Sequence, residues 1–276
     1  MREQLFRGFS AALLAGVALW AFCLLLGPGE PAYQGRPLTY WVRQQQQSWL
    51  LPHSPSRIEA DHAIRSIGTN ALPLLLKWTA AKDSLFQRKL VAWARKQSLI
   101  KVRFHSDEEY HAQADAGFAS LGALAKPAVP ALIKLLNHSD TMVRVTAEYD
   151  LMWIGPEAQD AVPALVRCLN DGDFIVRFRA TRCLRDIHMK PELAVPALVH
   201  SLGKPGVPLR ETIAALAQFG EDAKPAVPRL MNLLESKDPG TRLAASYALE
   251  VIDPAARPSA PFDDQNVLPG AHGHRL

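Results

Sequence analysis

A five-residue pattern, Ala-Val-Pro-Ala-Leu or Ala-Val-Pro-Arg-Leu, recurs four times in the second half of the chain. Its prolines, Pro130, Pro163, Pro196 and Pro228, are 33, 33 and 32 residues apart. A period of this length is typical of proteins built from stacked repeats, in which each unit buries its apolar face against the units beside it. We therefore expect an extended array with a continuous core and a long exposed surface, which suits binding better than catalysis.

Two helices are predicted in each repeat. The marker proline falls in the first turn of the first helix, where the amide hydrogen that proline lacks has no intrahelical partner in any case. We expect Asp160 to cap one of these helices and Pro127 and Pro225 to open two others. In the second helix an arginine is followed by apolar residues three, seven and ten positions later, on one helical face. These residues are Arg144, Ala147, Leu151 and Ile154; Arg177, Ala180, Leu184 and Ile187; and Arg242, Ala245, Leu249 and Ile252.

The repeat pattern extends beyond the four clear copies, and we expect the array to occupy residues 38–252. Residues 57–68 match the second helix, and residues 71–75, Ala-Leu-Pro-Leu-Leu, match the first helix that follows. The next unit is longer than the others, which predicts an additional helix at about 84–98. Polar residues replace the expected apolar face in residues 253–276, so a disordered tail is predicted there.

Second helices are expected to end at residues in the left-handed conformation. Gly155 and Gly220 adopt it without the steric cost of a Cβ atom, and His188 takes the same place in the unit between them. That unit is followed by Gly-Lys-Pro-Gly-Val-Pro at 203–208, where only Arg210 remains of the polar pattern described next. We predict a bend or a looser joint at this point.

In three second helices an aspartate precedes the arginine by four positions. We expect each aspartate to cap its helix and to form an ion pair with the arginine on the helix surface. The pairs are Asp140 and Arg144, Asp173 and Arg177, and Asp238 and Arg242.

The Ala-Val-Pro openings and the Asp, Val, Arg and Ile-Gly positions of the second helices resemble HEAT repeats, above all the short bacterial variety also found in phycobilisome-lyase-like proteins. The resemblance implies an all-α fold, an α-α superhelix or HEAT-like solenoid, over residues 38–252. In such proteins Asp–Arg pairs of this kind form a polar ladder that links successive repeats. The Trp and Leu-Gly pattern of tetratricopeptide repeats and the Thr-Pro-Leu-His of ankyrin repeats are missing from the sequence.

The N-terminal segment predicts a single membrane-spanning or signal helix ahead of the solenoid. Residues 8–27 contain no charge and are long enough to cross a bilayer, which needs about 20 residues. Arg2 and Arg7 precede this run, so residues 1–27 are expected to anchor the chain with its N-terminus in the cytoplasm. The solenoid would then be periplasmic, joined to the anchor by a linker at 28–37. The alternative is secretion after signal cleavage, with small residues at Gly27 and Gly29 before the cut.

The strongest charge imbalance lies between Lys77 and Arg103, where eight residues are basic and one, Asp83, is acidic. On the additional helix the basic side chains point away from an apolar face. They form either an ordinary solvated surface or a docking patch for an acidic partner, anionic lipid or nucleic acid. The residues of this possible partner-docking patch are Arg88, Lys89, Arg95 and Lys96.

No motif in the sequence predicts catalysis, a cofactor or a metal site. Nine histidines include no HExxH arrangement, and there is no Gly-Xaa-Ser-Xaa-Gly elbow, phosphate-binding glycine loop or GxGxxG. Cys168 and Cys183 sit on successive helices of one repeat, and spacing alone leaves open whether they form a disulfide.

The sequence therefore predicts a membrane-anchored HEAT-like scaffold that binds another protein outside the cytoplasm and is not an enzyme. No small-molecule substrate is inferred. The resemblance to phycobilisome-lyase-like proteins implies an alternative, a chaperone or enzyme of that type. A second alternative is a nucleic-acid-binding solenoid that uses residues 77–103, although the predicted export argues against nucleic acid as a partner.

Overall fold

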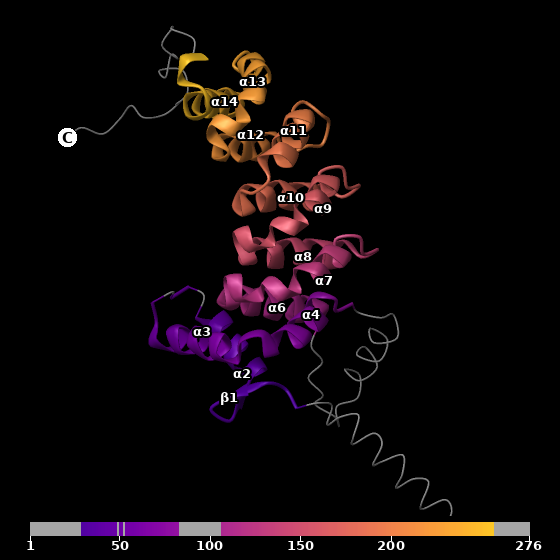
Figure 1. The fold of residues 1–276 in the computed structure, drawn as a ribbon, viewed down its shortest axis with the longest axis vertical. Coiled ribbons are helices and arrows are strands. Elements are labelled where there is room, and N and C mark those ends of the chain that lie inside the picture. Colours follow the sequence, from indigo (N-terminus) through magenta and orange to yellow (C-terminus); the bar gives the residue numbers. More distant parts are fainter. Residues whose placement is uncertain (1–28, 49, 52, 83–105, 257–276) are drawn as a thin grey trace, which may run out of the picture. The chain divides into compact units, whose positions relative to one another are not determined.

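The computed structural model describes residues 29–48, 50, 51, 53–82 and 106–256, which are nearly all helical and divide into two compact units after Leu74 (Figure 1). The predicted anchor, the additional helix with Arg88, Lys89, Arg95 and Lys96, and residues 257–276 of the tail predicted at 253–276 lie outside the described residues. Residues 254–256 of that tail form a 3₁₀ helix, so the prediction of disorder is wrong for them.

The first unit begins with a β-hairpin. Strands β1 (Ala32–Tyr33) and β2 (Arg36–Pro37) pair antiparallel. Gln34 and Gly35, which connect them, have φ values of 49° and 73°, as a two-residue hairpin turn requires. The sequence predicted a linker here, and the structure shows a hairpin instead because this Gln-Gly turn allows the strands to pair.

Two helices complete the first unit, α2 (Leu38–Gln47) and α3 (Pro55–Ile67), followed by the 3₁₀ helix η1 (Gly68–Ala71). Trp41 is 1% exposed, and its indole Nε1 donates a hydrogen bond to the backbone oxygen of Tyr33. Ser54 caps α3 by accepting a hydrogen bond from the amide of Arg57. The hairpin is thus held to the helices by the tryptophan at the centre of the unit.

Helix α4 (Leu72–Thr79) leads into the second unit, in which first and second helices alternate. The second helices α6, α8, α10, α12 and α14 pack against one another in chain order (Figure 1). The elements are α6 (Asp107–Leu121), η2 (Gly122–Ala128), α7 (Val129–Leu135), α8 (Thr141–Ile154), η3 (Gly155–Ala161), α9 (Val162–Cys168), α10 (Phe174–Ile187), α11 (Pro191–Ser201), α12 (Leu209–Gln218), η4 (Gly220–Ala226), α13 (Val227–Leu233), α14 (Pro239–Ile252) and η5 (Pro254–Ala256).

The apolar positions predicted for the second helices form the core of this unit. In α8, α10 and α14 all nine of them are at most 2% exposed. Burial of such side chains is the main favourable contribution to folding, at about 25 cal/mol per Å² of apolar surface. The predicted helical face is therefore confirmed, and the second unit is an array of helical repeats.

The first helices start as predicted in three repeats and differently in the repeat that contains Pro196. Pro130, Pro163 and Pro228 occupy the first or second position of α7, α9 and α13. Pro196 instead lies inside α11, which starts at Pro191. Lys190, the residue before α11, has a φ of 53°. The first turn of α11 takes the place of the 3₁₀ helix found in the other repeats.

The caps predicted for the first helices are wrong. Asp160 lies in η3, and Pro127 and Pro225 lie inside η2 and η4. Each of these 3₁₀ helices runs directly into the following α-helix. The α-helix therefore has no separate N-terminus at which a side chain could cap its first amides. At the predicted ends of the second helices, Gly155, Gly220 and His188 have positive φ values of 71°, 55° and 50°. The left-handed conformation is confirmed at His188 but not at Gly155, where ψ is −142°.

Among the described residues, one helical run, Asp107–Leu135, is long and apolar enough to cross a membrane. It comprises α6, η2 and α7, and half of its apolar window is buried inside the array. Core packing accounts for its composition.

Candidate functional site

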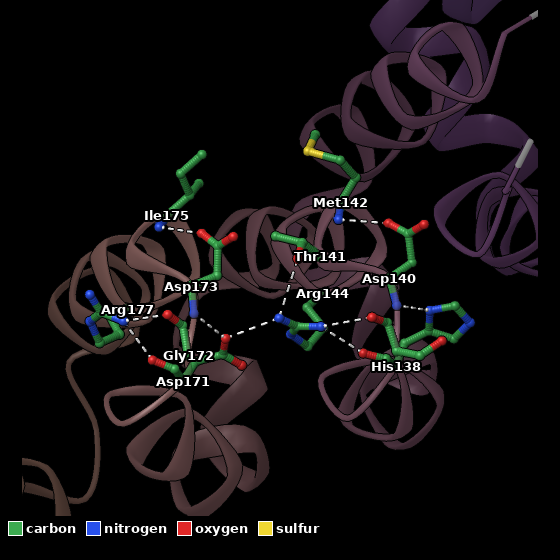
Figure 2. Close-up of polar contacts among 11 residues, drawn as sticks. His138, Asp140, Thr141, Met142, Arg144, Asp171, Gly172, Asp173, Ile175 and Arg177 are labelled. Atoms are coloured by element: carbon green, nitrogen blue, oxygen red, sulfur yellow. Dashed lines mark hydrogen bonds and ion pairs between the residues drawn. The ribbon is translucent and has the colours of Figure 1, made fainter.

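The arginine of each regular second helix binds the turn that precedes its own helix. Arg144 donates from Nη1 to the backbone oxygens of His138 and Ser139, at 2.8 and 3.4 Å (Figure 2). Because these carbonyls follow the end of the first helix, the arginine joins the two helices of one repeat. Arg177 makes the same pair of bonds to Asp171 and Gly172, and Arg242 to Ser236 and Lys237.

The aspartates cap the second helices as predicted. The carboxylate of Asp140 accepts a hydrogen bond from the amide of Met142 at 2.9 Å, and Asp173 accepts one from Ile175 at 2.8 Å (Figure 2). Asp238 caps α14 in the same way through Thr241. The ion pairs predicted four residues apart do not form at these six described residues, because the arginines turn back to the preceding carbonyls while the aspartates bind helix amides.

The arginines also link one repeat to the next. Arg144 Nη2 lies 3.0 Å from Oδ1 of Asp171 in the following turn, and Arg177 Nε donates to the backbone oxygen of Gly206 at 2.9 Å. Beyond them, the pKa of Asp238 is lowered mainly by hydrogen bonds from Thr241 and in part by the charge of Arg210. One ion pair between repeats, Arg144 with Asp171, is thus present, but Asp171 is not one of the capping aspartates from which the ladder was predicted. The next link, at the irregular segment 203–208, uses the backbone oxygen of Gly206.

A shallow pocket of about 590 Å³ lies beside this ladder. Its polar groups already bind one another, since Arg144 pairs with Asp171, and Asp171 also accepts a hydrogen bond from the amide of Asp173. The pocket is therefore part of the joint between repeats. Its lining residues are Leu136, Asn137, His138, Thr141, Arg144, Asp171, Gly172 and Asp173.

Glu148 of α8 is a carboxyl group buried between two repeats. The residue is 1% exposed, and no donor lies in hydrogen-bonding geometry to either carboxyl oxygen. Burial, followed by the charge of Asp171, raises its pKa to about 9, while Arg144 opposes the shift. The sequence predictions missed this residue, although an acid in the middle of a core-forming helix was a visible signal.

The two cysteines of the array are free thiols next to Glu148. Burial and the charge of Glu148 raise the pKa of Cys168 to about 12, and burial also raises that of Cys183. The thiol of Cys183 donates to the backbone oxygen of Glu148 at 3.4 Å. Burial and raised pKa values disfavour the nucleophilic thiolate form, and the disulfide that the spacing left open is not formed.

A second buried carboxyl group lies on the opposite side of α8. Asp150 is fully buried and accepts a hydrogen bond from the hydroxyl of Thr79 at 2.6 Å. Burial raises its pKa well above the ordinary value, and the charge of Asp115 adds to the shift. Asp115 itself accepts a hydrogen bond from the indole of Trp153. The two pairs are thus separate internal polar contacts, and the second carboxyl oxygen of Asp150 has no hydrogen-bond partner.

The face of the second helices that points away from the core carries large apolar side chains. Met142 at the start of α8 is 45% exposed, and Ile175, 33 residues later in the equivalent position of α10, is 48% exposed. Both project to the same side of the two neighbouring helices (Figure 2). Phe174, which precedes Ile175, is 50% exposed.

Arginine and aromatic side chains adjoin this apolar patch. The guanidinium of Arg179 lies 3.9 Å from the ring centre of Tyr149 on α8 and 5.6 Å from that of Phe178. Phe178 contacts Phe174 with a ring separation of 6.2 Å. We define the exposed second-helix face as the exposed side chains Met142, Phe174 and Ile175 together with the half-buried side chains Tyr149, Phe178, Arg179 and Arg182.

Within the described ranges, no group of three or more His, Cys, Asp or Glu side chains is arranged to hold a metal ion. The predicted docking patch of Arg88, Lys89, Arg95 and Lys96 lies outside the described residues. The exposed second-helix face was not predicted from the sequence.

Comparison with known proteins identifies the repeats. A family model of HEAT repeats matches residues 97–185 and 129–218. The two overlapping matches confirm the resemblance over residues 97–218. No curated protein matches the chain.

Several solved structures are similar to parts of this chain. An engineered protein is 23% identical with a TM-score of 0.46, over 80% of this chain and 97% of its own. A computationally designed armadillo repeat protein for modular peptide recognition is 19% identical, with a TM-score of 0.42, over 78% of this chain and all of its own. A mutant of Kap121p is 17% identical with a TM-score of 0.47, over 78% of this chain and 25% of its own. These identities and scores are too low to carry over a partner or an activity.

Proposed function

We propose that this chain, in which residues 97–218 are HEAT repeats, is a scaffold that binds a partner protein through the exposed second-helix face. The observation that carries the proposal is the alignment of Met142 and Ile175, which are nearly half exposed at equivalent positions of adjacent helices. Exposed apolar patches of this kind are typical of interaction sites. Aromatic and arginine side chains, which adjoin the patch, are enriched at protein interfaces.

The proposal assigns no catalytic role to the chain. The polar side chains of the ladder are engaged in linking repeats, and the thiols of Cys168 and Cys183 are buried with raised pKa values. Both features are those of a rigid frame that holds a surface in place. A binding scaffold needs such a frame because rigid surfaces lose less conformational entropy on association.

We further propose that residues 8–27 anchor the scaffold in a membrane and that the repeats lie on the extracytoplasmic side. The support is the uncharged run of 20 residues behind Arg2 and Arg7. A reporter fused after residue 276 tests this. Activity on the periplasmic side supports export, and activity in the cytoplasm contradicts it.

Capture of a partner protein by cross-linking tests the binding face. A partner that is cross-linked to the unchanged full chain is not expected to be captured by the variant Ile175→Asp, because this substitution places a charge in the apolar patch. Leu193→Asp is the matched control, since Leu193 is 42% exposed but lies on a first helix, α11. Equal capture by the unchanged chain and both variants, with circular dichroism confirming that all three are folded, would reject this face.

A further inference from the structure

Helix α10 carries two arginines that have no ion-pair partner among the described residues. Arg185, on the same helix, is paired with Asp186 at 2.8 Å and lies 3.7 Å from Glu211. Arg179 and Arg182 form no such pair, and the Nε atom of each is shielded from solvent without a hydrogen-bond partner. A guanidinium group whose Nη atoms form no hydrogen bond with the described residues can bind a planar anion such as a carboxylate through them.

Two carboxyl groups are affected by the charge of Arg179. The charge of Arg179 acts on Asp115 and Glu148, but neither carboxyl forms an ion pair with it. Asp115 instead accepts the hydrogen bond from Trp153, and Glu148 lies in the core with a pKa of about 9. The stack of Arg179 on Tyr149 holds the guanidinium in one orientation at the surface.

We propose that the exposed second-helix face binds a segment of the partner protein in which carboxylate side chains alternate with apolar ones. Arg179 and Arg182 pair with the carboxylates, and Met142, Phe174 and Ile175 contact the apolar side chains. This inference rests on the proposed protein-binding function and adds the chemistry of the partner to it. The surface is complementary in both charge and apolar character to such a segment.

The same face fits nucleic acid poorly. Two arginines neutralise few phosphates, whereas binding to a phosphate backbone requires many contacts. Exposed Met142 and Ile175 side chains offer nothing to a phosphate backbone.

Peptide selection tests the inference without knowledge of the partner. A displayed library of random peptides, about twelve residues long, is panned against the full chain in detergent, and the selected peptides are labelled for fluorescence anisotropy. We expect the selected peptides to be enriched in Asp and Glu next to apolar residues. The double substitution Arg179→Gln/Arg182→Gln should weaken their binding about tenfold or more, the effect of losing charge-assisted hydrogen bonds.

Arg167→Gln is the control, because it removes one positive charge from an exposed position on a first helix, α9, away from the exposed second-helix face. It should leave peptide binding unchanged. The inference is overturned if no peptide is selected, if the selected peptides lack acidic residues, or if the double variant binds them as the control does. Binding of a labelled oligo-dT of about twelve nucleotides, lost in the double variant, would assign the arginines to nucleic acid instead.

The proposed function and this inference fail in different ways. If Ile175→Asp abolishes partner capture while Arg179→Gln/Arg182→Gln does not, the face binds protein but does not select acidic segments. If neither substitution changes capture, the face itself is the wrong one.

Discussion

At the scale of single residues, the buried carboxyl groups decide how the stability of the array depends on pH. Glu148 faces Arg144, Asp171, Arg179 and Cys168, and its pKa of about 9 lies above the ordinary value of 4.5. Below about pH 4.5 the group is protonated in both the folded and the unfolded chain. As the pH rises from there towards 9, the unfolded chain releases the proton while the folded chain keeps it, so stability is lost across this window.

Replacing Glu148 by Gln should remove that loss, because glutamine keeps the shape of the protonated acid and does not ionise. The melting temperature of Glu148→Gln is therefore expected to exceed that of the unchanged chain at about pH 8.5, with a smaller difference at about pH 5.5. Thermal unfolding followed by circular dichroism measures both. The exposed substitution Glu221→Gln is the control. A difference between Glu148→Gln and the unchanged chain that does not vary with pH would contradict the assignment.

A close contact at Gly117 gives a prediction at the scale of helix packing. A Cβ atom at Gly117 of α6 would lie 2.3 Å from a methyl carbon of Leu75, which is fully buried. Gly117→Ala should therefore lower the free energy of unfolding by about 1–3 kcal/mol, the usual cost of overpacking. Urea unfolding measures the change.

Two further variants separate this clash from a general effect of alanine. Leu75→Val shortens the opposing side chain, so the double variant should lose less stability than the sum of the two single ones. Gly172→Ala should have a small effect, since no atom lies within 4 Å of its Cβ position. Additive losses in the double variant would show that the two residues do not press on each other.

The arginine ladder gives a second prediction at this scale. Arg144 binds its own turn and the carboxylate of Asp171, and the side chains of this pair are only 13% and 17% exposed. Arg144→Ala should lower the free energy of unfolding by about 1–3 kcal/mol, because charge-assisted hydrogen bonds are lost. Arg242→Ala, which removes the same turn bonds in the last repeat, should cost less, and equal losses would assign no energy to the link between repeats.

For the molecule as a whole, repeat architecture predicts that damage stays local. Each repeat contacts its neighbours only, so stability is close to a sum of repeat and interface contributions. In Arg144→Ala, amide hydrogen exchange should rise in α8 and α10 and stay unchanged in α14. Exchange followed by mass spectrometry resolves these helices. A uniform rise over all second helices would indicate a single cooperative unit instead.

Repeat periodicity predicted much of this molecule. The core face at Ala147, Leu151 and Ile154, the caps at Asp140 and the change of backbone at Gly155 all follow from local rules that act within one helix and its flanking turns. The arrangement of Pro196 and the hairpin at residues 32–37 did not follow, because a left-handed residue at Lys190 and the pairing of two strands override the local pattern.

The sequence by itself determined the fold class and the length of the repeat, since amphipathic helices with a regular apolar stripe have to bury that stripe against one another. Only the tertiary structure decided which polar residues meet. That Arg144 binds the next repeat, that Glu148 is sealed in the core and that Arg179 stacks on Tyr149 beside an unpaired Arg182 depend on how adjacent helices are rotated about their axes. That rotation results from the packing of many side chains at once, and no single segment of the sequence contains it.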